Sequence, residues 1–293
     1  MRILISGSTG FIGTALVKKL QDDGHTIVRL VRDAHHAGIL WDPYKKTIDR
    51  SRLEGFDVVV NLSGESINGR WTSSKKKKII DSRVESARFL ADCFRKLQQP
   101  PKAYISASAI GYYGDRNDEE LTESSKPGND FLAEVCMKWE AEAKPIADAG
   151  IRVAHIRTGL VLSPDGGAFK QLLLPFKLGL GGPVGSGRQW WSWIAFSDII
   201  KIYEFAITND ISGPVNAVAP NAVRNREFVK LLGKALHRPA FMPLPSFAVK
   251  LIFGEMGDGL LLGSQHVIPK VLEAKGFGFE QTDLLTCLKG MVG

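Results

Sequence analysis

A glycine-rich turn close to the start of the chain constrains the fold more strongly than any other feature. Residues 3–20 read ILISGSTGFIGTALVKKL, so Gly7, Gly10 and Gly13 separate an apolar run from a stretch in which apolar residues have helical spacing. Glycines at this spacing let a strand pass into a helix through a tight turn. We therefore expect a strand at residues 2–6, followed by a helix that ends before Gly24.

The alternation of strand and helix continues through the first half of the chain. Apolar and periodic segments predict strands at residues 26–31, 39–41, 57–62, 103–107 and 151–156, with helices at 73–97 and 131–147. Strands joined in this way need right-handed crossovers and form a parallel sheet. The expected fold class is α/β, a Rossmann-type doubly wound parallel sheet with a smaller mixed C-terminal substrate lobe.

The second half is less regular and indicates a change of domain. Helices are expected at residues 197–208 and 226–236, and glycine- or proline-rich loops at 179–187 and 241–245. We expect residues 1–165 to form the Rossmann domain, rejoined by about 189–220, and residues 166–293 to form the smaller lobe.

Composition excludes several classes of protein. Hydrophobic residues make up 44% and charged residues 24% of the 293 residues, as in ordinary globular proteins, and no apolar run is long enough to span a membrane. Cys93, Cys136 and Cys287 are far apart, which is typical of a reducing compartment, and no histidine or cysteine pair has metal-ligand spacing. With no export signal before the first strand, we expect a cytoplasmic monomer or homodimer with no metal and no membrane partner.

The formal net charge of +7 raises the question of nucleic acid, because four lysines form the run Lys75 to Lys78. Thr72 supplies an N-cap before the run, and apolar residues with helical spacing follow it. We expect a solvated helix start with neighbouring carboxylates, and no nucleic-acid partner. Binding of nucleic acid or an acidic surface through these lysines is the weaker alternative.

The glycine turn itself predicts a ligand. The first glycine allows the turn, the second lets a pyrophosphate approach the backbone, the third lets helix and strand pack closely, and the helix N-terminus attracts negative charge. The predicted pyrophosphate site consists of Gly7, Ser8, Thr9, Gly10, Phe11, Ile12 and Gly13.

The end of the second expected strand indicates which dinucleotide is bound. NAD enzymes carry an acidic residue there for the ribose 2′-hydroxyl, whereas this chain has Arg32 followed by Asp33. A guanidinium suits a 2′-phosphate, so NADP is favoured and NAD is the less favoured alternative.

Several motifs together resemble a known family. They are the glycine turn, Asn61-Leu62-Ser63-Gly64, the segment from Ser106 to Gly114, and the phrases FLAEVCMKWEAEA, LLPFKLGLGGPVGSG and HVIPKVLEAKGF. The chain resembles the atypical extended short-chain dehydrogenase/reductases of the epimerase-like type, often called nucleoside-diphosphate-sugar epimerases, which have a family-specific C-terminal domain. The resemblance implies that the cofactor also meets Leu62, Ser63, Gly64, Arg83, Ser106 and Leu160, with Lys78 as a further candidate.

The residues expected to do chemistry depart from this resemblance. The parent superfamily uses a Tyr-x-x-x-Lys pair, in which the lysine lowers the tyrosine pKa for proton transfer. If Lys138 is the lysine, Glu134 stands at the tyrosine position; a shift of two residues gives Leu132 and Cys136 instead. The candidate catalytic residues are Ser108, Tyr113 and Lys138.

Two functions remain open on this basis. The first is an NADP-binding, epimerase-like oxidoreductase that acts on an unknown small or nucleotide-linked carbonyl or alcohol. The second is a non-catalytic NADP-binding regulator or sensor, because the Tyr-x-x-x-Lys pair is absent.

Overall fold

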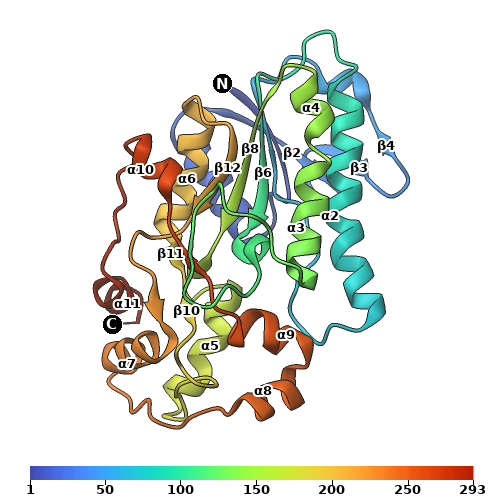
Figure 1. Ribbon diagram of the computed structural model, residues 1–293. Coiled ribbons are helices and arrows are strands. Elements are labelled where there is room, and N and C mark those ends of the chain that lie inside the picture. The colour runs from blue at the N-terminus through green and yellow to red at the C-terminus, as the bar shows by residue number, and fades with distance from the viewer. Residues whose placement is uncertain (293) are drawn as a thin grey trace.

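An eight-stranded sheet organises the first half of the chain, in the order β12-β8-β6-β5-β1-β2-β3-β4 (Figure 1). The computed structural model describes residues 1–292, and its sheet consists of β1 (Arg2–Ser6), β2 (Thr26–Val31), β3 (Ile39–Asp42), β4 (Thr47–Ile48), β5 (Val58–Asn61), β6 (Ala103–Ala109), β8 (Arg152–Thr158) and β12 (Gly213–Ala217). Every neighbouring pair is parallel except β3 and β4. This doubly wound order confirms the expected fold class.

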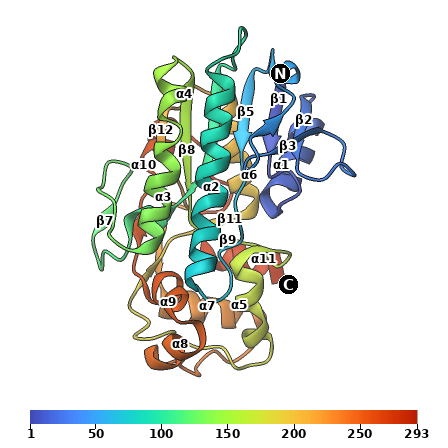
Figure 2. The same ribbon diagram turned by 90° about the vertical axis from the view of Figure 1, so that its right-hand side faces the viewer.

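Helices cover both faces of the sheet (Figures 1 and 2). On one face, α1 (Phe11–Asp22) and α6 (Phe196–Thr208) bury their apolar sides in a shared core with β1, β5, β6 and β8. The other face is covered by α2 (Ser73–Phe94), α3 (Phe131–Ala141) and α4 (Lys144–Asp148). The expected single helix at 131–147 is therefore two helices, and Pro145 lies in the first turn of the second, where its missing N–H is tolerated.

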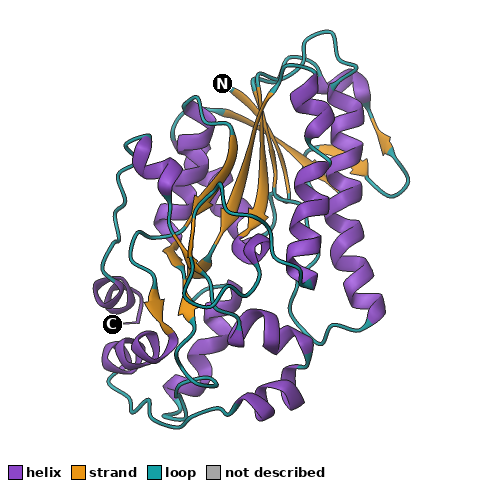
Figure 3. Cartoon of the chain, viewed as in Figure 1, coloured by secondary structure: helices purple, strands orange, loops and turns teal. Residues whose placement is uncertain are grey.

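A smaller lobe of mostly helical structure lies beyond the carboxyl edge of the sheet (Figure 3). Its core is formed around α5 (Gly167–Lys177), α7 (Asn225–Leu236) and α11 (Leu284–Val292), with α8 (Ser246–Phe253), α9 (Glu255–Gly257) and the π-helical turn η3 (Asp258–Leu262) beside them. Short strand pairs connect it to the sheet: β9 (Leu160–Leu162) with β11 (Trp193–Ala195), and β10 (Trp190–Trp191) with β13 (Val223–Arg224). The exact domain limits stay a prediction.

The end of the chain returns to the sheet. The strand β14 (His266–Val267) pairs with β7 (Glu120–Leu121), and α10 (Lys270–Ala274) follows, with Leu272 buried in the same core as α1 and α6. The buried carboxylate of Asp198 on α6 accepts hydrogen bonds from the backbone N–H groups of Glu280, at 2.8 Å, and Gln281, at 3.0 Å. Two 3₁₀ turns complete the structure, η1 (Arg50–Leu53) and η2 (Ile110–Tyr113).

Residues 1–292 lack two features that would place the protein in a class excluded by its composition. None of the helices there is both long enough and apolar enough to cross a membrane. The same residues hold no group of three or more His, Cys, Asp or Glu side chains arranged to bind a metal ion.

Candidate cofactor and active site

The turn between β1 and α1 has the geometry that its glycines predict. Gly7 has a positive φ of 67°, and a Cβ on it would lie 2.6 Å from the carbonyl oxygen of Leu62. A Cβ on Gly13 would lie only 2.2 Å from the carbonyl oxygen of Gly7, so the third glycine lets α1 pack against the turn. The N–H of Gly10 closes the turn by donating to Gly7 O at 3.0 Å.

The polar groups of this turn fit an anionic ligand. The Ser8 hydroxyl is buried and has no hydrogen-bond partner among the described residues, which is costly for a buried polar atom. Within the same part of the chain, no side chain caps α1 and no acidic residue occupies its first turn, so its N–H groups and dipole face outward beside exposed Thr9. A pyrophosphate supplies the missing acceptors, and the predicted turn therefore fits a dinucleotide.

The side of the turn next to the lobe is apolar. The half-buried Phe11 ring stacks on Phe196 with 4.5 Å between ring centroids, and a Cβ on Gly166 would lie 2.4 Å from the Phe11 ring. Ile12 is half-buried and packs against the core of α1 and α6. The start of α5 therefore rests directly on the glycine turn.

Arg32 is exposed directly after β2, as the cofactor prediction requires. The neighbouring Asp33 carboxylate accepts a hydrogen bond from the N–H of His35 at 2.9 Å, so it is engaged in its own turn. The pKa of Glu65 is held below its ordinary value, first by the hydrogen bond from Lys75 and also by the charges of Lys78 and Arg32. Positive groups from β2 and α2 therefore converge beside Glu65.

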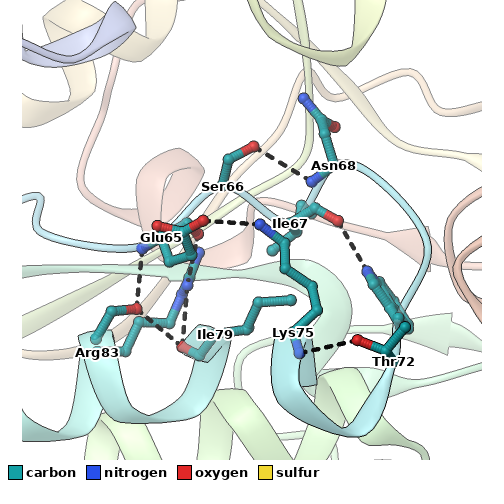
Figure 4. Close-up of polar contacts among 10 residues, drawn as sticks. Glu65, Ser66, Ile67, Asn68, Thr72, Lys75, Ile79 and Arg83 are labelled. Carbon is teal, nitrogen blue, oxygen red and sulfur yellow. Dashed lines mark hydrogen bonds and ion pairs between the residues drawn. The ribbon is translucent and has the colours of Figure 1, made fainter. Parts of the chain in front are cut away.

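The loop from Leu62 to Thr72 is held by α2 (Figure 4). Arg83 Nη1 donates to the carbonyl oxygens of Glu65 at 2.9 Å and Ile79 at 3.1 Å, and Ser82 Oγ accepts from the Glu65 N–H at 2.9 Å. A Cβ on Gly64 would lie 3.1 Å from Arg83 Cζ, and burial lowers the pKa of Arg83. Arg83 thus supports the backbone of the predicted cofactor loop from behind.

A buried network fixes the start of that loop. Ser6 Oγ donates to Asn61 Oδ1 at 2.6 Å, and Asn61 Nδ2 donates to the Tyr104 hydroxyl at 2.8 Å. The same Asn61 oxygen accepts from the N–H of Ser63 at 3.2 Å, and the N–H of Leu62 donates to Ser6 O at 3.2 Å. The predicted residues Leu62, Ser63 and Gly64 therefore lie beside the glycine turn.

Three of the four lysines at the start of α2 form ion pairs. Lys75 pairs with Glu65 at 2.7 Å, Lys77 with Asp81 at 2.6 Å, and Lys76 with Glu255 of α9. Lys78 lies three residues after Lys75 and four before Ser82, hence on the face of α2 that meets the cofactor loop.

The end of β6 carries Ser106 and Ser108, both buried. Ser106 Oγ donates to Ala107 O at 3.2 Å, whereas Ser108 Oγ donates to Glu140 Oε1 on α3 at 2.7 Å. Glu140 in turn accepts two hydrogen bonds from Arg157 of β8, at 2.9 and 2.8 Å. Ser108 is therefore attached to a buried, bidentate ion pair.

Tyr113 belongs to the same network. Its hydroxyl donates to Asn216 Oδ1 at 2.6 Å and accepts from Arg157 Nη1 at 3.0 Å. Burial raises the pKa of Tyr113 to about 12. The Arg157 guanidinium also lies 3.4 Å from the centroid of the Tyr112 ring. In this arrangement the Tyr113 hydroxyl is a weak acid with both its bonds made inside the protein.

The inward face of α3 carries Leu132 and Cys136, the second of the two possible registers. A Cβ on Gly111 of η2 would lie 3.1 Å from the Leu132 Cβ, and Cys136 Sγ lies 3.6 Å from Ala109 O. Burial raises the pKa of the Cys136 thiol to about 11. Lys138, predicted as catalytic, is about half exposed and forms a 2.5 Å ion pair with Glu134, so the structure does not bring it to Ser108.

The last predicted contact comes from the segment after β8. Leu160 begins β9, pairs with Trp193 and donates its N–H to Ser192 O at 2.9 Å. Its half-buried side chain packs with the lobe core.

Sequence reasoning missed Glu140 and Arg157. A signal for them existed, since Arg157 directly follows the strand expected at residues 151–156, and a charge buried there requires a partner. The sequence alone left that partner unidentified.

The sequence of the chain matches two known domain families. Residues 3–218 match the profile of the NAD dependent epimerase/dehydratase family, and residues 244–291 match DUF1731, a domain of unknown function. The chain belongs to the NAD-dependent epimerase/dehydratase family. The resemblance to epimerase-like proteins with a family-specific C-terminal domain is thereby confirmed.

Similar proteins match this chain over nearly all of its length. The human epimerase family protein SDR39U1 is 40% identical over 297 residues, covering 100% of both chains. An epimerase family protein of Mycobacterium bovis is 40% identical over 287 residues, covering 96% of this chain and 94% of the relative.

Solved structures of other proteins have a similar fold over the whole of this chain. The structure of human SDR39U1 with NADPH has a TM-score of 0.92 at 38% identity and covers 100% of this chain and 99% of that one. A nucleoside-diphosphate sugar epimerase of Corynebacterium glutamicum has a TM-score of 0.82 at 40% identity, covering 100% of this chain and 58% of that one. MoeE5 in complex with UDP-glucuronic acid and NAD, at 19% identity and a TM-score of 0.80, shows the fold alone.

Proposed function

We propose that the chain binds NADPH at the glycine turn and acts as an oxidoreductase of the epimerase type. Two features carry the proposal. Within residues 1–292, the glycine turn has no side-chain cap and its Ser8 hydroxyl has no hydrogen-bond partner; Arg32 is exposed beside Asp33, whose carboxylate is bonded in its own turn. The NADPH in the structure of human SDR39U1 supports the same cofactor. Arg32 would bind the 2′-phosphate through charge-assisted hydrogen bonds.

The residues at the end of β6 suggest how a substrate oxygen is held. When bound, the cofactor supplies hydride chemistry, as NADPH toward a carbonyl carbon and as NADP⁺ toward an alcohol carbon. Ser108 donates its proton to Glu140, which leaves the Ser108 oxygen as an acceptor for a substrate hydroxyl. Arg157 holds the Glu140 carboxylate in place, so the proton of that hydroxyl has a short path through Ser108 toward Glu140. The substrate class is a small or nucleotide-linked alcohol or carbonyl.

Titration with NADPH and NADH, followed by cofactor fluorescence, tests the cofactor assignment. Arg32→Ala is expected to weaken NADPH roughly 10- to 100-fold, because a hydrogen bond to a charged group contributes about 1.5–3 kcal/mol, and to leave NADH unchanged. Arg95→Ala, an exposed arginine just past the far end of α2, is the matched control and is expected to bind both normally. Equal losses for the two cofactors in Arg32→Ala would place the 2′-phosphate elsewhere.

A second candidate is a cofactor-binding protein without turnover, and it is favoured by Leu132 and Cys136 on the inward face of α3. Neither side chain can replace the tyrosine and lysine of the parent superfamily in proton transfer. Loss of NADPH fluorescence on addition of aldehydes, ketones or quinones separates the two candidates. Oxidation that Ser108→Ala abolishes while NADPH affinity stays normal supports the enzyme; bound NADPH that no compound oxidises supports the second candidate.

A further inference from the structure

Large apolar side chains are exposed mainly at one end of the molecule. Among residues 1–292, twelve large hydrophobic residues are exposed, and eight of them lie on α5, on α8 and on the loops beside them. Their exposed fractions run from 47% to 75%, for Leu174, Leu178, Leu180, Phe241, Met242, Phe247, Leu251 and Ile252. A concentration of this kind marks an interaction surface rather than the scattered apolar residues of an ordinary surface.

The two segments that carry these residues form one surface. The N–H of Met242 donates to Gly181 O at 3.1 Å, and the N–H of Leu244 donates to Pro183 O at 2.8 Å, so the two loops run side by side. Arg238 reaches the end of α5 by donating to Lys177 O at 3.3 Å. Figures 1 and 2 both show α5, α7 and α8 at the end of the molecule farthest from the N-terminus. We call residues 166–182 and 228–254 the lobe tip.

The charge of the lobe tip has a single sign. Its two segments contain no aspartate or glutamate and six cations, Lys170, Lys177, Lys230, Lys234, Arg238 and Lys250. Their formal charge of +6 compares with +7 for the whole chain. Among the described ion pairs, these cations meet a carboxylate at Lys250, whose Nζ lies 3.6 Å from Asp258 Oδ1.

Cations and apolar residues share the exposed helix faces. On α5, Lys170, Leu174 and Leu178 follow at intervals of four residues, with Lys177 beside them. On α8, Phe247 and Leu251 are four residues apart and flank Lys250. Helices that lie in a membrane interface have this composition, because lysine stems extend along apolar surface while the ammonium groups reach the headgroups.

We propose that the lobe tip docks on an anionic lipid surface, with α5 and α8 lying flat against it. This proposal departs from the prediction of no membrane partner, which rested on the lack of an apolar run long enough to span a bilayer. A second copy of the chain fits less well, because a two-fold contact would bring two sets of six cations together.

Sedimentation of the full chain with vesicles tests the proposal. Binding is expected to vesicles that contain about one third phosphatidylglycerol and not to pure phosphatidylcholine, and to weaken at least tenfold when salt rises from about 0.05 to 0.5 M. The double variant Phe247→Ser/Leu251→Ser and the double variant Lys230→Gln/Lys234→Gln are each expected to weaken binding at least tenfold.

The controls remove similar side chains elsewhere. Leu40→Ser and Lys18→Gln change an exposed apolar residue and an exposed lysine at the other end of the molecule, and both are expected to bind vesicles like the wild type. Thermal unfolding and NADPH binding confirm that each variant is folded. Equal binding to both kinds of vesicle, or full binding by the two tip variants, overturns the proposal. Failure of the wild-type chain to bind either kind of vesicle also overturns it. That outcome includes a wild-type chain that forms dimers instead, if Phe247→Ser/Leu251→Ser abolishes those dimers.

Discussion

The glycine turn and the end of β6 lie at the same edge of the sheet, but they differ in whether their buried polar groups have hydrogen-bond partners within the protein. In the turn, the Ser8 hydroxyl is buried without a partner in the part of the chain that the structure describes, and the start of α1 has no side-chain cap there. At the end of β6 the buried polar groups bond to one another, through Ser108, Glu140, Arg157, Tyr113 and Asn216.

This difference separates a turn whose buried hydroxyl needs a partner from outside from a network whose polar groups are already bonded to one another, with the Ser108 oxygen left as an acceptor for a substrate. A buried polar group without a partner costs about 1–3 kcal/mol until something supplies one. The turn is therefore completed from outside, whereas the network fixes the ends of β6 and β8 whether or not a ligand is bound. The largest effects on folding should come from the network, and the largest effects on binding from the turn.

Breaking the ion pair of the network should have the largest effect. Arg157→Leu leaves the Glu140 carboxylate buried without its partner and is expected to lower the free energy of unfolding by about 3–5 kcal/mol in urea denaturation. Arg157→Leu/Glu140→Leu should recover part of that loss. Lys138→Ala breaks an exposed ion pair on the same helix as Glu140 and should lower the free energy of unfolding by under about 1 kcal/mol. If Arg157→Leu and Lys138→Ala lower it equally, the network does not stabilise the fold.

Gly13→Ala should have the largest effect on the turn. Its Cβ would lie 2.2 Å from Gly7 O, so α1 must move away from the turn. We expect NADPH affinity to fall roughly 100-fold, about 2.7 kcal/mol, in a fluorescence titration. Gly278→Ala, where a Cβ meets nothing within 4 Å, is the matched control. Normal affinity in Gly13→Ala would show that close packing of α1 is not needed for binding.

Ser8→Ala separates binding from folding. The hydroxyl is buried without a partner within the described residues, so its removal relieves a desolvation cost, and the free energy of unfolding without ligand should rise by about 1 kcal/mol. A lost hydrogen bond to the cofactor should weaken NADPH about fivefold, or about 1 kcal/mol. Destabilisation of the ligand-free protein together with unchanged affinity would mean that the turn, like the network, is complete without a ligand.

Acid should lower the stability of the fold weakly through His155. Burial lowers the pKa of His155 below its ordinary value of 6.5, so the unfolded chain binds its proton more readily than the folded one. The contribution of neutral His155 to stability is therefore present above pH 6.5 and is lost as the pH falls below it. Urea denaturation between about pH 7 and 5 should show this slope, and His155→Gln should reduce it; an unchanged slope would exclude His155 as its source.

The glycine turn and the central strands could be predicted because local sequence determines them. The turn needs Gly7 and Gly13 wherever the strand runs straight into a helix, and buried parallel strands are apolar throughout. The strand β12 lacks this signal because it reads GPVNA, and Pro214 is tolerated only because β12 lies at the sheet edge.

The network could not be predicted because its partners meet only in three dimensions. Glu140 and Arg157 are 17 residues apart, and Asn216 and Tyr113 are 103 residues apart. The direction of a side chain on α3 decides between Lys138 and Glu140, and spacing alone cannot fix that direction without the position of β6. The NADP prediction needed only the residue that follows β2, and it agrees with the NADPH of the human relative.

The packing of residues 272–281 against α6 and the sheet affects how the chain folds during translation. The ribosome completes the strands of the sheet well before Leu272, Glu280 and Gln281 are synthesised, yet Leu272 packs in the core of that sheet and the other two satisfy the buried Asp198 carboxylate. The nascent sheet therefore keeps one apolar face partly uncovered until residues 272–281 have been synthesised. A chain cut short before residue 270 would lack part of the core on which its first half depends.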